Sequence, residues 1–444
     1  MREERLKRRF VSDIIVRDGH NARSRRNYVS ERKDGGMKKK TAPVTLHYMM
    51  LTGGFWMAFC IVTSYAAVYL QAAGYSNSEL GLIMASGSLG GAVLSPALGA
   101  WIDRKRTVRH ATVIYILLAV QTILLILLRV NPRRNLPGAV CYALYMAFLL
   151  PVNAVNLDLC VRLEHAGAPL DFGFARSMGS FSFVIISAVL GSLVEKLTYL
   201  VLPFAGLVII VLQFLGTRLT DADLREAEKT AEAAGEENAG SSSSLPAFFR
   251  ENRPFCVMLI ATVLIFIAHN AEGNFLINVV RNLGGDTKIM GYLAAFIAII
   301  EVPVMLFSDR LPRRFSCSQY IRLALALFVL KVLSCALAPN IPLLFASRLL
   351  QAPSYALYTI LIVPFADAAV PHKDSAKAQS LAFSMTTVGS VIASLAGGRL
   401  FDICSVRATM LIMTAIAAVG AAVAIGAAFR CGNVELPERR NGDQ

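Results

Sequence analysis

The chain has 444 residues, of which 55% are hydrophobic and only 17% are charged, against roughly 25% charged residues in an average soluble domain. Its mean hydropathy of +0.54 excludes a cytoplasmic enzyme, a disordered protein, a collagen-like chain and a disulfide-stapled secreted domain. The net charge of +14 could indicate nucleic-acid binding, but the basic residues lie in tails and short loops between apolar blocks, as expected of cytoplasmic loops in a membrane protein.

The first 45 residues are polar and strongly basic, and we expect residues 1–45 to form a disordered cytoplasmic tail. No cleavable signal peptide is visible, because the first apolar block begins only near Leu46 and is too long for the apolar core of such a peptide. A second methionine, Met37, opens a Met-Lys-Lys-Lys run that is typical of the start of a bacterial membrane protein. We therefore interpret residues 1–36 either as part of the tail or as an upstream extension that is not translated.

Twelve apolar blocks follow, and each is about as long as the ~20 residues that an α-helix needs to cross a bilayer. They cover residues 46–72, 79–102, 108–129, 138–161, 173–194, 198–217, 254–281, 288–308, 318–338, 341–366, 378–401 and 406–429. The sequence therefore predicts an all-α membrane protein with 12 transmembrane helices. We expect it to lie in the cytoplasmic (inner) membrane of a bacterial cell.

A long hydrophilic stretch, residues 218–252, separates the sixth block from the seventh. It is rich in Glu and contains four consecutive serines from Ser241, so it cannot bury enough apolar surface to fold. We interpret it as a cytoplasmic linker between an N-terminal six-helix bundle, residues 46–217, and a C-terminal six-helix bundle, residues 253–430. Residues 431–444 would form a second cytoplasmic tail.

Lys and Arg are distributed unevenly between the two sets of loops. If the N-terminus is placed in the cytoplasm, the cytoplasmic loops hold 15 Lys and Arg residues and the outer loops hold 7. The positive-inside rule then predicts that both termini are cytoplasmic. A cluster of Arg129, Arg133 and Arg134 in one outer loop does not follow this rule.

The two halves of the chain resemble each other. Three pairs of short segments recur at offsets of 210, 206 and 207 residues, namely Gly81 with Gly291, Asp103-Arg104 with Asp309-Arg310, and Gly191-x-x-x-Glu195 with Gly398-x-x-x-Asp402. Weak symmetry between six-helix halves is typical of secondary transporters, which bind their solute at mid-membrane between the repeats. We therefore expect two pseudo-symmetric bundles around a central cavity.

The loop after the second block resembles a signature of the major facilitator superfamily, G-x-x-x-D-[RK]-x-G-x-[RK]-[RK]. The matching positions are Gly99, Asp103, Arg104 and Arg109. Arg106 stands where the family has glycine. The resemblance implies a gating role on the cytoplasmic side for Gly99, Asp103 and Arg104, and for a degraded second copy at Asp309-Arg310. An ordinary basic loop is the alternative interpretation of both copies.

The segment around Asp158 and Arg176 resembles the fourth and fifth helices of the lactose-permease branch of proton symporters. In that branch F-G-x-A-R-x-x-G opens helix five, and an acidic residue lies eighteen positions before the arginine. Here the motif begins at Phe172, and Asp158 stands eighteen positions before Arg176. The resemblance implies that the two residues bind solute hydroxyls, since a guanidinium donates and a carboxylate accepts hydrogen bonds. A structural ion pair is the alternative.

Glu301 lies in an Ile-Glu-Val-Pro segment well inside the eighth block and resembles an element of the phenylpropionate- and nucleoside-type permeases. Intramembrane carboxylates are costly and usually functional, so Glu301 is a candidate proton carrier. Lys331, in the ninth block, occupies a place where the family usually has arginine. A Lys331–Glu301 pair would act as a proton-coupling switch, and a structural role for each charge is the alternative.

The tenth block departs from the lactose permeases. They have a histidine and, three residues later, the proton-carrying glutamate, whereas here these places hold Gln351 and Ser354, which carry no proton. Coupling then needs a group elsewhere, and His269 with Glu272 in the seventh block is a second candidate pair beside Glu301. Gln351, His269 and Asn274 are also candidates for binding the solute.

The eight cysteines form no C-x-x-C pair and lie mostly inside apolar blocks, so we interpret them as small buried hydrophobes rather than zinc ligands or disulfides. The sequence contains no phosphate-binding loop and no H-E-x-x-H motif. We therefore expect no enzymatic activity, no cofactor and no metal.

These features predict a secondary active transporter of a small polar solute: a sugar, a nucleoside or a small organic acid. We expect proton-coupled uptake by alternating access, with the solute, protons and the lipid bilayer as partners, no nucleic acid, and a monomeric state. Proton-driven efflux of amphiphilic compounds is the alternative within transport. A membrane sensor that keeps the fold without transporting is the alternative outside it, favoured by the missing carboxylate in the tenth block.

Overall fold

The computed structural model describes residues 35–105, 108–170, 172–231, 245–307 and 311–436. Within these ranges the chain forms helices and turns and no β-strand. Twelve helical segments are long and apolar enough to cross a membrane, which confirms the predicted all-α fold. The protein is therefore a multi-pass membrane protein.

The N-terminal half contains the first six membrane-spanning segments. Its helices are α2 (Gly35–Thr63), α3 (Ala66–Ala72), α4 (Asn77–Arg104), α5 (His110–Val130), α6 (Leu136–His165), α7 (Phe172–Lys196) and α8 (Val201–Ala231). Helix α8 continues well into the stretch that the sequence assigned to a linker from residue 218 onward. An Asp221–Arg225 ion pair one turn apart, 2.8 Å between Oδ2 and Nη2, supports this extension.

The C-terminal half contains the other six segments. Its helices are α9 (Leu245–Glu251), α10 (Arg253–Asn274), α11 (Leu276–Asn282), α12 (Thr287–Leu306), α13 (Cys317–Leu337), α14 (Ile341–Arg348), the π-helical turn η2 (Ala352–Ala356), α15 (Leu357–Ala369), α16 (Ser375–Ile403) and α17 (Val406–Arg430). The tenth span is thus made of three pieces, and the π-helical turn contains Pro353, which cannot donate a backbone hydrogen bond. Such turns occur frequently at functional sites.

The internal repeat extends to the irregular parts of the helices. The first span is interrupted between α2 and α3 at Tyr65, and the seventh span is interrupted between α10 and α11 at Phe275, an offset of 275 − 65 = 210 residues. This offset equals that between Gly81 and Gly291. Both interruptions lie in segments that border the space between the two halves, where broken helices commonly form solute sites.

Helix starts follow ordinary capping rules. Ser76 caps α4 and forms a capping box with Glu79, which satisfies backbone N–H groups at the helix start that have no partner within the helix. Glu79 also pairs with Arg134, 2.9 Å between Oε1 and Nη2. Arg134 belongs to the arginine cluster that does not follow the positive-inside rule, and this contact gives it a local partner.

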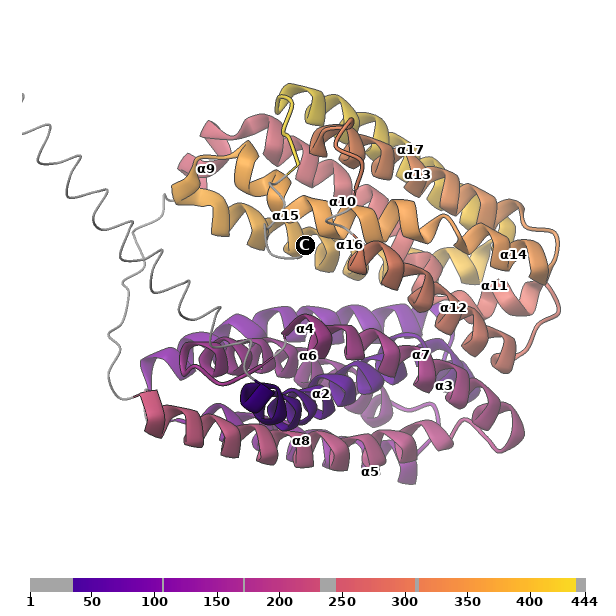
Figure 1. Ribbon diagram of the computed structural model, residues 1–444. Coiled ribbons are helices and arrows are strands. Elements are labelled where there is room, and N and C mark those ends of the chain that lie inside the picture. The colour runs from indigo at the N-terminus through magenta and orange to yellow at the C-terminus, as the bar shows by residue number, and fades with distance from the viewer. Residues whose placement is uncertain (1–34, 106–107, 171, 232–244, 308–310, 437–444) are drawn as a thin grey trace, which may run out of the picture.

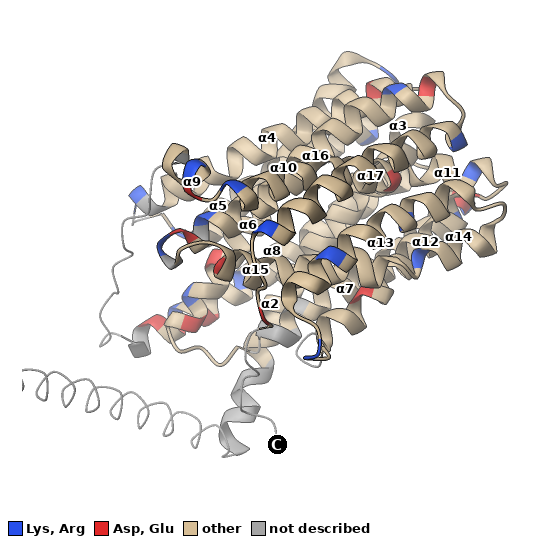
Figure 2. Ribbon diagram, turned by 90° about the horizontal axis from the view of Figure 1, so that it is seen from above, with Lys and Arg blue, Asp and Glu red and all other residues tan. Residues whose placement is uncertain are grey.

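The two halves pack side by side, with α7 against α12 and α4 against α16 (Figure 1). We call the end of the molecule where α3 meets α4 and α11 meets α12 the linker-distal end, and the opposite end the linker end. Charged residues gather at the two ends of the helices and leave the middle largely uncharged (Figure 2). This distribution is the one a bilayer requires.

Candidate functional site

A cavity of about 480 Å³ lies between the two halves. This volume is in the range of small-molecule sites, roughly 300–1,000 Å³. The cavity borders the first, seventh and tenth spans, which are the three that contain an interruption or a π-helical turn. The irregular helices and the cavity therefore lie at the same place.

The two walls of the cavity differ in chemistry. The N-terminal half contributes aromatic, aliphatic and hydroxyl side chains: Trp56, Phe59, Thr63, Ser64, Ser88, Met146, Leu150, Ser180 and Phe183. The C-terminal half contributes amide, imidazole, carboxylate and phenol groups as well, namely those of His269, Asn270, Asn274, Glu301, Gln351 and Tyr355. Among the described residues, every ionisable side chain that lines the cavity lies in the C-terminal half.

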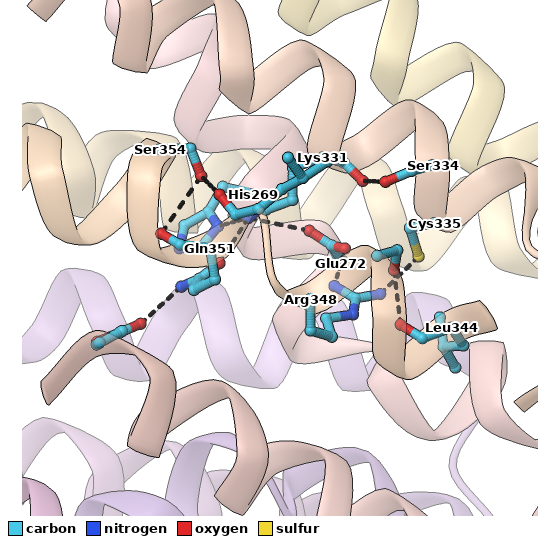
Figure 3. Close-up of polar contacts among 12 residues, drawn as sticks. His269, Glu272, Lys331, Ser334, Cys335, Leu344, Arg348, Gln351 and Ser354 are labelled. Carbon is cyan, nitrogen blue, oxygen red and sulfur yellow. Dashed lines mark hydrogen bonds and ion pairs between the residues drawn. The ribbon is translucent and has the colours of Figure 1, made fainter. Parts of the chain in front are cut away.

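Behind this second wall, Lys331 is the centre of a buried polar cluster (Figure 3). Its ammonium group on α13 lies 2.6 Å from His269 Nδ1, 3.0 Å from Gln351 Oε1 and 3.2 Å from Glu272 Oε2. Lys331 is 1% exposed. A buried lysine is stable only when its charge and its donors find partners. Gln351 accepts a hydrogen bond from Lys331, and Glu272 pairs with its charge.

Arg348 on α14 and Glu272 on α10 form the other side of the cluster (Figure 3). Their side chains make an ion pair, and Arg348 Nη2 lies 2.7 Å from the sulfur of Cys335. Both residues are 2% exposed. Glu272 therefore has two cationic partners, Arg348 and Lys331, and does not reach the cavity.

Glu301 on α12 is the carboxylate that borders the cavity. One of its oxygens accepts a 2.7 Å hydrogen bond from Gln351 Nε2. Gln351, one residue before the π-helical turn, thereby connects Glu301 to Lys331. Counting Glu272 and Glu301 against Lys331 and Arg348, the cluster carries no net charge when both carboxylates are ionised and His269 is neutral.

The predicted solute-binding residues fall into two groups. His269, Asn274 and Gln351 all border the cavity, as their assignment requires. Asp158 does not border it: this carboxylate is 47% exposed and pairs with His110 of α5 and with Arg162 one turn later on α6. Asp158 therefore pairs with His110 and Arg162 within the N-terminal half. The side chain of Arg176 lies outside the described residues.

The predicted gating residues lie at the linker end of α4. Arg104 is exposed and Gly99 has open space beside it. The side chain of Asp103 and all of Asp309 and Arg310 lie outside the described residues.

Contacts at the linker-distal end were missed by sequence reasoning. The carboxylate of Asp402, at the end of α16, accepts hydrogen bonds from the backbone and side chains of Asn77 and Ser78, at 2.5 to 3.0 Å. These residues begin α4 of the other half, where an anion is favourable. Glu195, at the end of α7, accepts a 3.3 Å bond from the backbone of Thr287, which begins α12.

Two pairs of glycines bring the same helices together. Gly81 approaches Gly398 and the carbonyl of Ser394, while a Cβ added to Gly191 would lie 3.0 Å from the Cα of Gly291. Gly81 and Gly291 are equivalent positions of the sequence repeat, and they do not contact each other. In the structure Gly81 packs against Gly398, and Gly291 packs against Gly191. The repeat offset in the sequence identifies these four glycines as related, but it does not show which of them are in contact.

The fold and the cavity between two six-helix halves define a transporter of the major facilitator type, not an enzyme. The chain belongs to the MFS_1 like family, whose family model matches residues 46–412. This match confirms the resemblance seen in the loop after the second span.

Named relatives and solved structures agree with this assignment. The chain is 24% identical over 357 residues, 78% of this chain and 88% of the relative, to a protein of Deinococcus radiodurans named as a candidate sugar efflux transporter. It is 24% identical over 255 residues to a maltose permease of Geobacillus stearothermophilus, covering 57% of this chain and 62% of that protein.

Two solved structures share the fold. The nucleoside transporter NupG is 16% identical, with a TM-score of 0.67 over 87% of this chain and 99% of its own. A D-xylose-proton symporter is 13% identical, with a TM-score of 0.63 over 91% of this chain and 100% of its own. At these identities the likeness shows the fold alone.

Proposed function

We propose that the protein takes up a neutral, hydroxyl-rich solute of the sugar class together with protons, by alternating access. The observation that carries this proposal is the composition of the cavity wall, which combines hydroxyl, amide and imidazole groups with the single described carboxylate Glu301. Lys331 and Arg348 are buried behind this wall and paired, so they offer no free cation to an organic acid. The names of the maltose permease and of the Deinococcus relative support a sugar over the other solutes.

The linker end is the cytoplasmic end in this proposal, and both termini are cytoplasmic. The excess of Lys and Arg in the loops of that end supports the orientation. Hydrogen bonds between Asp402 and the start of α4 join the two halves at the linker-distal end, so in this proposal the structure represents the inward-facing state.

Glu301 carries the proton in this mechanism. It borders the cavity, whereas Glu272 is held by two cations and is 2% exposed. A carboxylate that alternately meets the two sides of the membrane can take up a proton on one side and release it on the other. Glu301 would act alone in this step, with Lys331 and Glu272 as fixed charges beside it.

The test measures uptake of radiolabelled maltose, D-xylose and uridine into transport-deficient cells that express the protein, with and without a proton gradient. We expect a sugar to accumulate when the outside is acidic. Glu301→Gln should abolish accumulation, while exchange of the same sugar continues at a reduced rate because the glutamine carbonyl still accepts a hydrogen bond. Glu164→Gln, at an exposed carboxylate at the linker end of α6, is the matched control and should behave as the natural protein. Accumulation by Glu301→Gln would refute Glu301 as the proton carrier.

Efflux is the second candidate direction, because the Deinococcus relative is named for sugar efflux. The same cells distinguish the two directions. Preloaded sugar that leaves faster in expressing cells, with no accumulation at acidic external pH, would favour efflux.

A further inference from the structure

His269 has one ring nitrogen toward Lys331 and borders the cavity with the rest of its ring. The Lys331 ammonium is a donor without acceptor capacity, so His269 Nδ1, 2.6 Å away, must be the acceptor. The imidazole is then neutral and carries its hydrogen on Nε2. An imidazolium, which has a hydrogen on both nitrogens, would place two donors against each other.

The ion pair with Glu272 favours the charged form of the lysine. Lys331 Nζ lies 3.2 Å from Glu272 Oε2, and a neutral amine would remove one of the two cations that face this buried carboxylate. As an ammonium, Lys331 has Gln351 Oε1 and His269 Nδ1 within hydrogen-bonding distance.

The ring of His269 is fixed in its plane by aromatic neighbours. It stacks on Tyr355 at 4.7 Å between centroids with an interplanar angle of 23°, and it meets Phe328 edge-on at 5.6 Å. Among the described residues none makes a hydrogen bond to His269 Nε2. The Nε2–H donor is therefore held at the cavity wall without a partner from the protein.

Lys331 also sets the orientation of Gln351. Because the Gln351 carbonyl faces Lys331, its amide NH₂ faces Glu301 and donates to Oε1 at 2.7 Å. The second carboxylate oxygen of Glu301 remains an acceptor at the cavity wall. One buried cation thus fixes both a donor, at His269, and an acceptor, at Glu301.

We propose that Lys331 is a positioning residue that presents His269 Nε2–H and the Glu301 carboxylate to a hydroxyl group of the solute. A hydroxyl is both donor and acceptor, so it fits this pair better than an ether or a deoxy position. The proposal rests on the proposed function for the identity of the solute, but the tautomer of His269 and its dependence on Lys331 can be tested without any solute.

The experiment records ¹⁵N spectra of the full chain, labelled at histidine, in lipid nanodiscs at neutral pH. The His269 signals are assigned by their absence in His269→Gln. We expect the neutral form with hydrogen on Nε2 in the natural protein, and a mixture of the two tautomers in Lys331→Met. Lys331→Arg retains donors at this place and should restore the single tautomer, and Lys288→Met, at a lysine beside Tyr292 at the start of α12, is the matched control.

A Nδ1–H tautomer or an imidazolium in the natural protein would overturn the proposal by itself, even if Lys331→Met failed to fold. An unchanged spectrum in folded Lys331→Met would also overturn it. Maltose, D-xylose and D-glucose are then added in turn. A shift of the Nε2 signal by one of them supports the hydroxyl contact, whereas no shift with any of them rejects it.

The two proposals fail in different ways. If the tautomer and its loss in Lys331→Met are observed but no sugar is transported, the proposed function is wrong and the positioning role of Lys331 stands. If sugar is transported but the tautomer differs, the positioning role is wrong and the function stands.

Discussion

Removing the Asp402 carboxylate should weaken the closed state of the linker-distal end. Asp402 accepts four hydrogen bonds from Asn77 and Ser78 of the other half. The contact is exposed, so we take the low end of the usual net value, about 0.5 kcal/mol for each bond. Asp402→Ala should then cost the closed state about 2 kcal/mol, which is roughly a 30-fold change in the equilibrium between closed and open forms.

Glu195 provides an internal comparison. It accepts a single 3.3 Å bond from the backbone of Thr287 across the corresponding contact. Glu195→Ala should therefore change the same equilibrium by about 0.5 kcal/mol, roughly twofold. From the number of hydrogen bonds alone, Asp402→Ala should therefore shift the equilibrium between closed and open forms more than Glu195→Ala.

The assay is the distribution of distances between two spin labels, one in the α5–α6 loop and one in the α13–α14 loop, in a chain whose native cysteines are replaced. We expect a longer-distance population that is large in Asp402→Ala and small in Glu195→Ala. Asp286→Ala is the control, because Asp286 caps α12 within its own half. The reasoning is refuted if Asp402→Ala keeps the natural distribution, or if Asp286→Ala changes it equally.

Three further outcomes are expected. Gly81→Leu should block closure of the linker-distal end, because its Cβ would meet the carbonyl of Ser394; transport should fall at least tenfold while the melting temperature of the protein is maintained. Asp158→Asn should leave the apparent affinity for sugar within about threefold, since Asp158 lies outside the cavity; a complete loss of binding in a binding assay would contradict this placement. Arg348→Met should lower stability by about 3–5 kcal/mol, the usual cost of breaking a buried ion pair, because Glu272 would keep only Lys331 as a cationic partner; thermal unfolding in detergent measures it.

Most of the fold could be predicted from the sequence, because hydrophobic length determines membrane spans almost directly. The twelve spans and the two-half organisation follow from composition and from a repeat offset near 207 residues. The helical continuation of α8 to Ala231 could not be predicted in this way. It is polar and contains the Asp221–Arg225 ion pair, a contact that composition does not show.

The candidate site could be predicted only in part. An ionisable residue inside an apolar block is conspicuous, so Glu301, Lys331, His269 and Glu272 were identified from sequence. Their pairing was not predictable, since it depends on which helix faces meet: the expected Lys331–Glu301 pair is bridged by Gln351 instead. Asp158 was assigned from its spacing to Arg176, and its contact with His110, 48 residues away in sequence, could not be predicted from that motif.

The uneven chemistry of the two cavity walls separates two tasks that a transporter must combine. The N-terminal wall holds no described ionisable side chain, so substitutions there alter the shape and size of the cavity and leave the proposed proton carrier Glu301 in place. We therefore expect substitutions at Trp56, Phe59 or Met146 to change which sugar the protein prefers, without changing the proposed proton transfer at Glu301.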